Sequence, residues 1–207
     1  MPTYDYELSA HEKGYTVVAG TDEAGRGPLA GPVFAAAVIL PDGLFIDGLN
    51  DSKKLSEKKR ERLFDLIRSE AISYCIASSS VEEIDSMNIL NASQLAMRRA
   101  VAGLEPHPDL VLVDGNIARG FDTDTLTIIK GDSLSMSIAA ASILAKVSRD
   151  RLCAELDREY PEYGFTGHKG YGTAHHMEMI RKYGVSPVHR KSFMGFLKKD
   201  CKECEKK

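Results

Sequence analysis

The sequence predicts an α/β protein, a mixed β-sheet flanked by helices with a small helical C-terminal extension. Two features indicate this fold class. Three short, β-branched or apolar segments come first and are joined by hairpin-like turns. Further apolar segments then alternate with helical ones, and this order is typical of a sheet covered by helices.

The first strands are expected at Val17–Thr21 and Pro32–Leu40, separated by a dense cluster of glycines and prolines that must bend the chain. Ser56 is a suitable N-cap for a helix over Glu57–Ser69, whose apolar residues recur at helical spacing. Ser73–Ser79 is the third predicted strand.

The middle of the chain alternates helix and strand. Asn88–Ala102 is amphipathic, and Gly103 is expected to end it. Leu110–Val113 and Leu126–Ile129 are short apolar runs of the kind that is buried on both faces of a sheet.

A long helix is expected from about Ser133 to Tyr160. Its early run Ile138–Ser142 contains only small residues after the isoleucine, which predicts that another element packs closely there. Thr173–Tyr183 is a further predicted helix, and a short one is expected near Ser192.

Composition points to an ordinary globular protein, because 43% of the 207 residues are hydrophobic and 28% are charged. The start of the chain is polar and acidic, unlike a signal peptide, and the apolar run 32–41 is shorter than the roughly 20 residues that span a bilayer. We therefore expect a soluble, cytoplasmic protein with no membrane partner, and a monomer.

Four cysteines, at positions 75, 153, 201 and 204, are too few and too irregular for a disulfide framework. Cys201 and Cys204 lie in a charged terminus without a second ligand pair, so a solvated tail is favoured over a zinc site.

The formal net charge of −3 does not by itself favour nucleic acid as a partner. Affinity for phosphate depends on where positive charge gathers, and basic residues do cluster. These clusters are at Lys53–Lys54, Lys58–Arg60, Arg98–Arg99, Lys146–Arg151 and His189–Lys191. Such runs are also common on solvated helix faces, so charge alone leaves both interpretations open.

Acidic residues recur where the predicted elements would bring them together. Asp22 and Glu23 close the first strand, Asp114 follows the buried strand, and Asp132 stands at the start of the long helix. Ligand sites of open sheets lie where strand ends and loops converge. Clustered carboxylates repel one another and supply the oxygen ligands that Mg²⁺ or Mn²⁺ requires, so the set is a candidate site for divalent cations.

Each of these acids also has a structural interpretation. Asp114 with Gly115 is a common turn, and Asp132 is a natural helix N-cap. Asp22 and Glu23 are neighbours, and neighbours on a regular strand point to opposite faces. They can share one site only if the strand ends or bulges there.

The segment Gly25-Arg26-Gly27 allows close approach of a ligand to the backbone. It weakly matches the dinucleotide fingerprint G-x-G-x-x-G/A, which must open a helix. Here Pro28, Gly31 and Pro32 lead into a strand instead, which argues against a nucleotide-binding α/β protein.

The separate segments resemble one family in order, from about Val17 to Phe193. The matching motifs are TDEAGRGPLAGPV (21–33), DSKKLS (51–56), VDG (113–115), KGD (130–132), SIAAASILAKV (137–147), GHKGYGT (167–173) and SPVHRKSF (186–193). Together they closely resemble bacterial ribonuclease HII.

This resemblance implies an RNase H-like fold with a five-stranded mixed sheet. It implies an endonuclease that hydrolyses the RNA strand of RNA–DNA hybrids and incises at single ribonucleotides embedded in duplex DNA, leaving 5′-phosphate and 3′-hydroxyl ends. It also implies that Asp22, Glu23, Asp114 and Asp132 bind two catalytic divalent cations, Mg²⁺ or Mn²⁺. The domains would be an N-terminal tail (1–15), a catalytic domain (16–163) and a C-terminal extension (164–207) that completes the substrate groove.

The resemblance further implies substrate-binding residues. Gly25, Arg26 and Gly27 would read the ribonucleotide's 2′-hydroxyl through backbone contacts, and Tyr171 would pack against the sugar at the RNA–DNA junction. Tyr171 alone, between two glycines, would more simply be a core or turn aromatic.

Basic residues in the same motifs are hypotheses for phosphate contacts. These are Lys53, Lys54 and Lys146, with Arg190 and Lys191 as weaker candidates. Asp150 is excluded from the acidic site, because eighteen helical residues would separate it from Asp132 by roughly 27 Å.

Two alternatives remain. Ribonuclease HIII carries an extra N-terminal domain, whereas only some sixteen residues precede the first strand here. A non-catalytic hybrid-binding protein could lose its carboxylates, yet all four are present.

Overall fold

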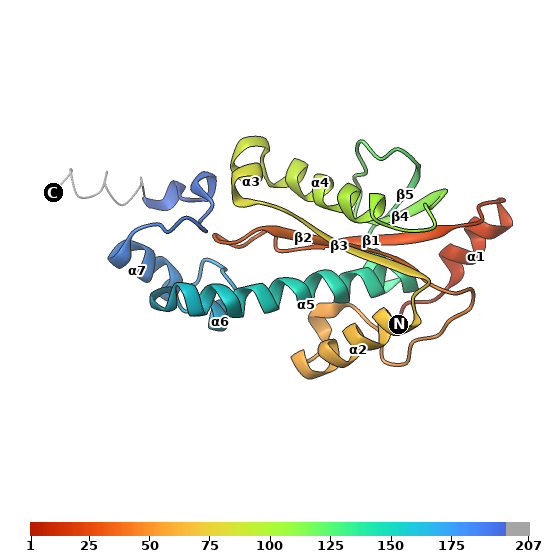
Figure 1. The fold of residues 1–207 in the computed structure, drawn as a ribbon, viewed down its shortest axis with the longest axis horizontal. Helices are drawn as coiled ribbons and strands as arrows, with labels where there is room; N and C mark the ends of the chain where they lie inside the picture. The colour runs from red at the N-terminus through yellow and green to blue at the C-terminus, as the bar shows by residue number, and fades with distance from the viewer. Residues whose placement is uncertain (198–207) are drawn as a thin grey trace.

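The computed structural model describes residues 1–197 (Figure 1). Its strands are β1 (Val18–Ala24), β2 (Val33–Ile39), β3 (Ser73–Ser79), β4 (Leu110–Asp114) and β5 (Asp124–Ile128). Its α-helices are α1 (Asp5–Glu12), α2 (Glu57–Glu70), α3 (Val81–Met87), α4 (Ile89–Ala102), α5 (Met136–Glu159), α6 (Phe165–His168) and α7 (Ala174–Tyr183). Short 3₁₀ turns η1 to η4 span Ser52–Lys54, Gly131–Ser133, Pro161–Tyr163 and Lys191–Phe193.

The five strands form one mixed sheet in the order β3-β2-β1-β4-β5. The pairs β3–β2 and β2–β1 are antiparallel, and β1–β4 and β4–β5 are parallel. The predicted five-stranded mixed sheet is therefore confirmed. The expectation that the fifth strand is buried on both faces was wrong, because β5 is an edge strand whose residues are exposed except at Ile128.

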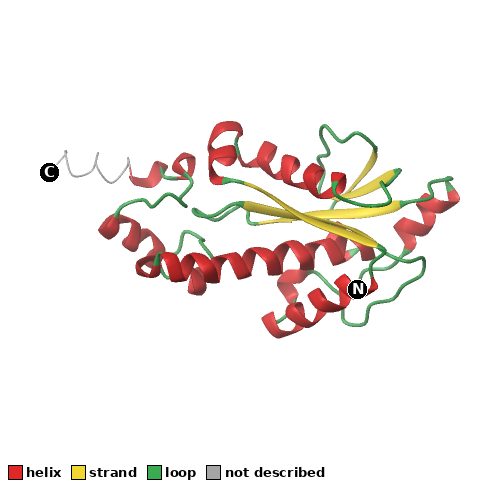
Figure 2. Ribbon diagram, in the orientation of Figure 1, coloured by secondary structure: helices red, strands yellow, loops and turns green. Residues whose placement is uncertain are grey.

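Helices cover both faces of the sheet (Figure 2). On one face, α5 and α2 enclose a core with β2; on the other, α4 packs against β2 and β3. The small residues Ala139, Ala140 and Ala141 are fully buried, as the close packing predicted for this run requires. Gly20 of β1 completes the contact, since a Cβ there would overlap the backbone of α5.

The helical termini differ from expectation at the start of α5. Asp132 does not cap this helix; it lies in the 3₁₀ turn η2, and the Ser135 hydroxyl is the N-cap, accepting a hydrogen bond from the Ile138 amide. The Asp132 amide instead donates to Asp114 Oδ1 at the end of β4.

Residues 1–15, expected as a tail, contain helix α1. Its Glu7 is buried, and Glu7 Oε1 accepts hydrogen bonds from the Ser135 hydroxyl (2.7 Å) and the Ser137 amide (3.0 Å). A tertiary contact with the start of α5 therefore holds in place a segment whose composition had not predicted a helix. Helix α3 was also not predicted, although Ser80 and Glu83 form a capping box at its start.

The C-terminal part packs on the far end of α5. A separate apolar cluster joins Leu156 of α5 and Ala30 of the β1–β2 loop to Tyr163, Phe165 and Ile180.

Among residues 1–197, no helix is both long and apolar enough to cross a bilayer. Cys201 and Cys204 lie outside the described residues.

Candidate active site

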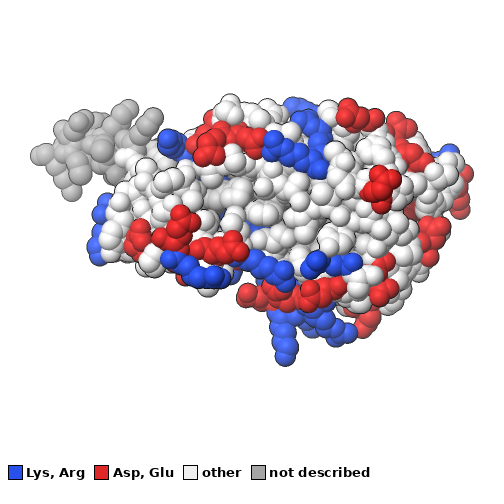
Figure 3. Space-filling view, viewed as in Figure 1, with Lys and Arg blue, Asp and Glu red and all other residues white. Residues whose placement is uncertain are grey.

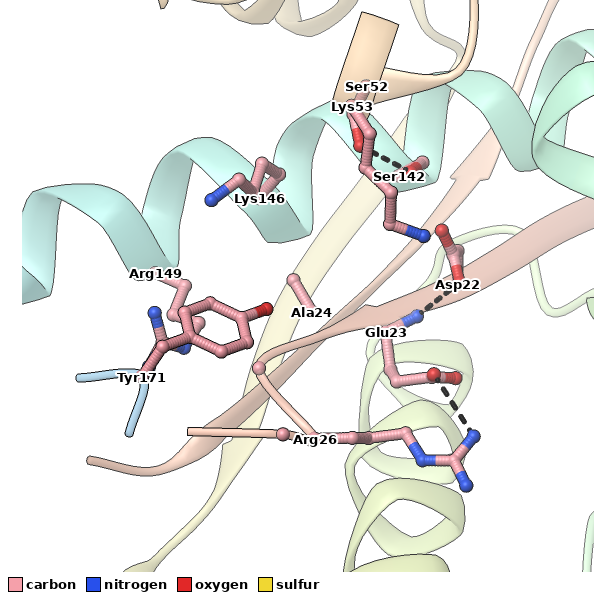
Figure 4. Close-up of a pocket in the computed structure, with 12 residues that line it drawn as sticks. Asp22, Glu23, Ala24, Arg26, Ser52, Lys53, Ser142, Lys146, Arg149 and Tyr171 are labelled. Atoms are coloured by element: carbon pink, nitrogen blue, oxygen red, sulfur yellow. Dashed lines mark hydrogen bonds and ion pairs between the residues drawn. The ribbon is translucent and has the colours of Figure 1, made fainter. Parts of the chain in front are cut away.

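A cavity of about 310 Å³ opens at the end of β1 (Figure 4). Four segments distant in sequence meet there: the end of β1 with the following loop, η1, one face of α5, and the loop before α7. The lining residues are Asp22, Glu23, Ala24, Gly25, Arg26, Gly27, Ser52, Lys53, Ser142, Lys146, Arg149 and Tyr171.

Asp22 and Glu23 both line this cavity although β1 neither bulges nor ends between them. Both pair regularly with β2, whereas the pairing of β1 with β4 stops at Thr21. From Asp22 onward, the β4 side of β1 is therefore open. Asp22 is 5% exposed and its Oδ1 accepts a hydrogen bond from the Glu23 amide at 2.7 Å, and Glu23 lies 3.5 Å from the Arg26 guanidinium.

Asp114 and Asp132 lie together on the neighbouring strand end. Asp114 is the last residue of β4, and its Oδ1 lies 3.3 Å from the Asp132 amide, which donates to it. Gly131 makes this turn possible, because a Cβ there would lie 3.3 Å from Asp114 Oδ1 and overlap the Ile138 side chain. Neither carboxylate lines the cavity itself.

The four carboxylates nevertheless share one electrostatic environment. Burial, together with the charges of Glu23 and Asp114, raises the pKa of Asp22 well above its ordinary value. Burial is also the main cause that raises the pKa of Glu23 and of Asp132, and the charge of Asp114 adds to it. Partial burial lowers the pKa of Lys53, but the nearby carboxylates, led by Asp22 and Asp132, together more than offset this and raise it overall.

The donor set fits a hard divalent cation, since it consists of carboxylate oxygens that repel one another. Lys53 supplies positive charge here, and its ammonium points toward Asp22 (Figure 4). In residues 1–197, no three His, Cys, Asp or Glu side chains already converge closely enough to hold a metal. The structure thus brings the predicted carboxylates to one end of the sheet without drawing them into a finished ligand shell.

The Gly25–Gly27 loop is held from behind by Arg190, which is fully buried. Arg190 donates to the carbonyls of Gly25 (2.6 Å) and Arg26 (2.9 Å). Because the peptide unit is planar and trans, this turns the N–H groups of Arg26 and Gly27 away from Arg190. The idea that Arg190 contacts phosphate was wrong, because its guanidinium is enclosed by backbone carbonyls.

Tyr171 is not a core aromatic; its side chain is 48% exposed and borders the cavity. Its ring lies beside Arg149, with the guanidinium carbon 6.0 Å from the ring centroid. A Cβ at Gly27 would lie 3.3 Å from Tyr171 Cε1. An alanine at position 27 would therefore require this ring to shift by a few tenths of an ångström.

The predicted lysines take different positions. Lys53 and Lys146 line the cavity, whereas Lys54 does not and its side chain is 62% exposed. Lys146 is engaged by Asp150 at 2.6 Å, and Asp150 also lies 3.7 Å from Arg60, so Asp150 is outside the acidic group as predicted. On the face shown in Figure 3, basic and acidic side chains are interspersed.

Sequence reasoning identified Lys146 but missed four lining residues, which are Ala24, Ser52, Ser142 and Arg149. Ser142, Lys146 and Arg149 project from one side of α5, and their i, i+4, i+7 spacing could have linked Ser142 and Arg149 to the lysine. Ser52 lies opposite, with its hydroxyl 3.1 Å from that of Ser142. Ser52 belongs to the DSKKLS motif, but no local pattern shows that its hydroxyl meets Ser142, because that position depends on tertiary packing.

Comparisons with known proteins show the family and the fold. The family model for ribonuclease HII matches residues 19–196. Ribonuclease HII of Acetivibrio thermocellus is 55% identical over 188 residues, which cover 91% of this chain and 73% of the relative. The enzyme of Delftia acidovorans is 61% identical over 177 residues, covering 86% and 75%.

Among solved structures, the ribonuclease H2 of Pyrococcus horikoshii OT3 superposes with a TM-score of 0.71 at 28% identity, covering 86% of this chain and 94% of that one. This likeness confirms the RNase H-like fold. Together with the sequence matches, it shows that the chain belongs to the ribonuclease HII family and is a ribonuclease H enzyme.

Proposed function

We propose that this ribonuclease H hydrolyses the RNA strand of RNA–DNA hybrids internally and also incises on the 5′ side of single ribonucleotides in duplex DNA, leaving 5′-phosphate and 3′-hydroxyl ends. One observation carries the proposal. The same cavity is lined by two of the carboxylates, by the Gly25–Gly27 loop and by Tyr171. Groups suited to cleavage and groups suited to recognising a ribose thus border one space.

For the cleavage step, Asp22, Glu23, Asp114 and Asp132 would hold Mg²⁺ or Mn²⁺. Two such cations activate a water and stabilise the leaving 3′-oxygen in phosphodiester hydrolysis. The raised pKa values of the carboxylates support this assignment, because a cation would relieve the repulsion that causes part of the shift. A cation would also compete with Lys53 for the same negative charge, which would release its ammonium to a substrate phosphate.

Recognition of the ribonucleotide would rest on the loop and the tyrosine. The 2′-hydroxyl is what distinguishes RNA from DNA, and it both donates and accepts hydrogen bonds. The N–H groups of Arg26 and Gly27 face away from Arg190 and belong to residues that line the cavity, so they are suitable donors. The Tyr171 ring would pack on the sugar, which makes the C-terminal extension part of the substrate groove.

Phosphate contacts are proposed for Lys53, Lys54 and Lys146. The first and last border the cavity. Such contacts release counterions, so substrate affinity is expected to fall steeply with added salt. A flat salt response would contradict these contacts.

The test is a cleavage assay on three duplexes of equal length: one with a single embedded ribonucleotide, one continuous RNA–DNA hybrid, and one of DNA alone. We expect cleavage of the first two with Mg²⁺ or Mn²⁺ and none with a chelator. Cutting on the 5′ side of the ribonucleotide would support the proposal. Binding of the hybrid without cleavage under any metal condition would instead favour the non-catalytic alternative.

A further inference from the structure

A buried pair of histidines in the C-terminal extension lies directly behind Tyr171. His176 and His189 are 0% and 1% exposed, and their Nε2 atoms are 3.1 Å apart. His176 comes from α7 and His189 from the segment before η4. Neither borders the cavity, and cleavage as described above uses neither.

Their hydrogen bonds determine where each proton sits. His176 Nδ1 lies 2.9 Å from the carbonyl oxygen of Tyr171, which can only accept, so this nitrogen carries a proton. His189 Nδ1 lies 3.0 Å from the backbone amide of Ser186, which can only donate, so this nitrogen is unprotonated. The neutral His189 ring then has its proton on Nε2 and donates it to the unprotonated Nε2 of His176.

The result is a one-way chain of hydrogen bonds from the Ser186 amide through both rings to the Tyr171 carbonyl. It requires both rings to be neutral, because a second proton on either one would place two N–H groups face to face. The surroundings favour neutrality: burial lowers the pKa of each histidine to about 4. The ring of His168 is stacked on that of His176, with the ring centroids 4.2 Å apart. The charge of a protonated His168 would also lower the pKa of both buried histidines.

The Tyr171 side chain has few contacts that could fix its position, so this position depends on how the Tyr171 backbone is held. The ring is half exposed and contacts the Arg149 side chain, so the place of the ring follows from its backbone. The Tyr171 amide donates to the His168 carbonyl at 2.9 Å, and the preceding Gly170 carbonyl accepts from the Leu29 amide at 2.8 Å. On the other side of the same residue, the Tyr171 carbonyl accepts from the Thr173 amide at 2.8 Å and from His176 Nδ1 at 2.9 Å.

We infer that His176 and His189 are positioning residues for ribonucleotide recognition, a neutral histidine pair that fixes the Tyr171 backbone and so places its ring against the sugar. This inference rests on the proposed role of Tyr171. It predicts that loss of the bond to the Tyr171 carbonyl reduces selectivity for a single ribonucleotide, and not merely stability.

Two variants of His176 separate selectivity from stability. In His176→Asn, the side-chain amide nitrogen lies near the former Nδ1 and still donates to Tyr171, but the contact with His189 is lost. In His176→Gln, the longer side chain reaches the former Nε2 position and keeps His189 as partner, but the donor to Tyr171 is lost. Each variant removes one of two bonds, so similar thermal stabilities are expected.

The readout is kcat/KM for the single-ribonucleotide duplex divided by kcat/KM for the continuous hybrid. We expect His176→Asn to keep this ratio within about twofold of wild type, and His176→Gln to lower it roughly five- to tenfold, the effect of one lost hydrogen bond. Tyr171→Ala is the reference and should lower the ratio at least as much as His176→Gln.

If Tyr171→Ala lowers the ratio and the two His176 variants remain equal, the positioning role is wrong while the proposed function stands. If Tyr171→Ala leaves the ratio unchanged, the proposed role of Tyr171 is wrong and the inference falls with it. Nitrogen-15 NMR of the wild-type protein gives an independent test that needs no variant to fold. We expect the Nδ1–H tautomer for His176 and the Nε2–H tautomer for His189; the reverse assignment would overturn the inference.

Discussion

Replacement of Arg190 by methionine is expected to reduce the free energy of unfolding by about 3–5 kcal/mol. Arg190 donates short hydrogen bonds to the carbonyls of Gly25 (2.6 Å), Gly31 (2.8 Å) and Arg26 (2.9 Å). At about 1.5 kcal/mol each, the low end for bonds to a charged group, their loss amounts to roughly 4.5 kcal/mol. Methionine also leaves these carbonyls buried without a donor, and water entering the gap would offset part of this cost.

Urea unfolding measures the fall in the free energy of unfolding directly. For a chain of this size, that fall corresponds to a decrease in Tm of roughly 10 °C. The matched control is Lys191→Met, which removes one positive charge at the next position, where the side chain is exposed. We expect that control to change stability by less than about 0.5 kcal/mol. A loss below about 1 kcal/mol in Arg190→Met would refute the role of the guanidinium as the clamp of the loop.

Three further predictions concern positions outside the four candidate metal ligands. Glu7→Ala should lower the free energy of unfolding by about 2–4 kcal/mol, because the Ser135 and Ser137 hydroxyls and the Ser137 amide lose their buried acceptor. A urea unfolding curve unchanged from wild type would contradict this. Burial lowers the pKa of His176 and His189 from about 6.5 to about 4, so between these pH values the two residues bind fewer protons in the folded protein than in the unfolded chain. The free energy of unfolding should therefore fall as the pH drops from about 6.5 to about 4. His189→Gln should show a shallower fall, and equal slopes would argue against the buried neutral pair. Gly27→Ala should displace the Tyr171 ring by a few tenths of an ångström and reduce single-ribonucleotide incision several-fold, with stability changed by less than about 1 kcal/mol. Full activity would show that incision does not depend on the exact position of the ring.

Local patterns predicted the sheet and its main helices well. The long helix was recognisable from its length and its small-residue run, since only small side chains let a helix approach a strand as closely as α5 approaches β1. β5 was misjudged because its hydrophobic residues were considered without their neighbours. Over Asp124–Ile128 they alternate with threonine, which is typical of a half-exposed edge strand.

The candidate site was predictable as a set of residues but not as a geometry. Asp22 and Glu23 were expected to share one space only if the strand ended or bulged there, whereas the observed solution is that β1 extends beyond its pairing with β4. That solution depends on the relative lengths of two strands more than eighty residues apart. Arg190 was placed on the surface because basic runs usually are; its burial depends on carbonyls that only the folded loop gathers.

The most direct test of the proposed mechanism is cleavage of a duplex containing one ribonucleotide, in Mg²⁺ or Mn²⁺, by the Asp22→Asn variant. Asp122→Asn is the control, because it makes the same change at an exposed position. We predict that Asp22→Asn abolishes cleavage and leaves substrate binding largely intact, while Asp122→Asn cleaves as the wild type does. Cleavage retained in Asp22→Asn would remove this carboxylate from the metal site and contradict the proposed mechanism.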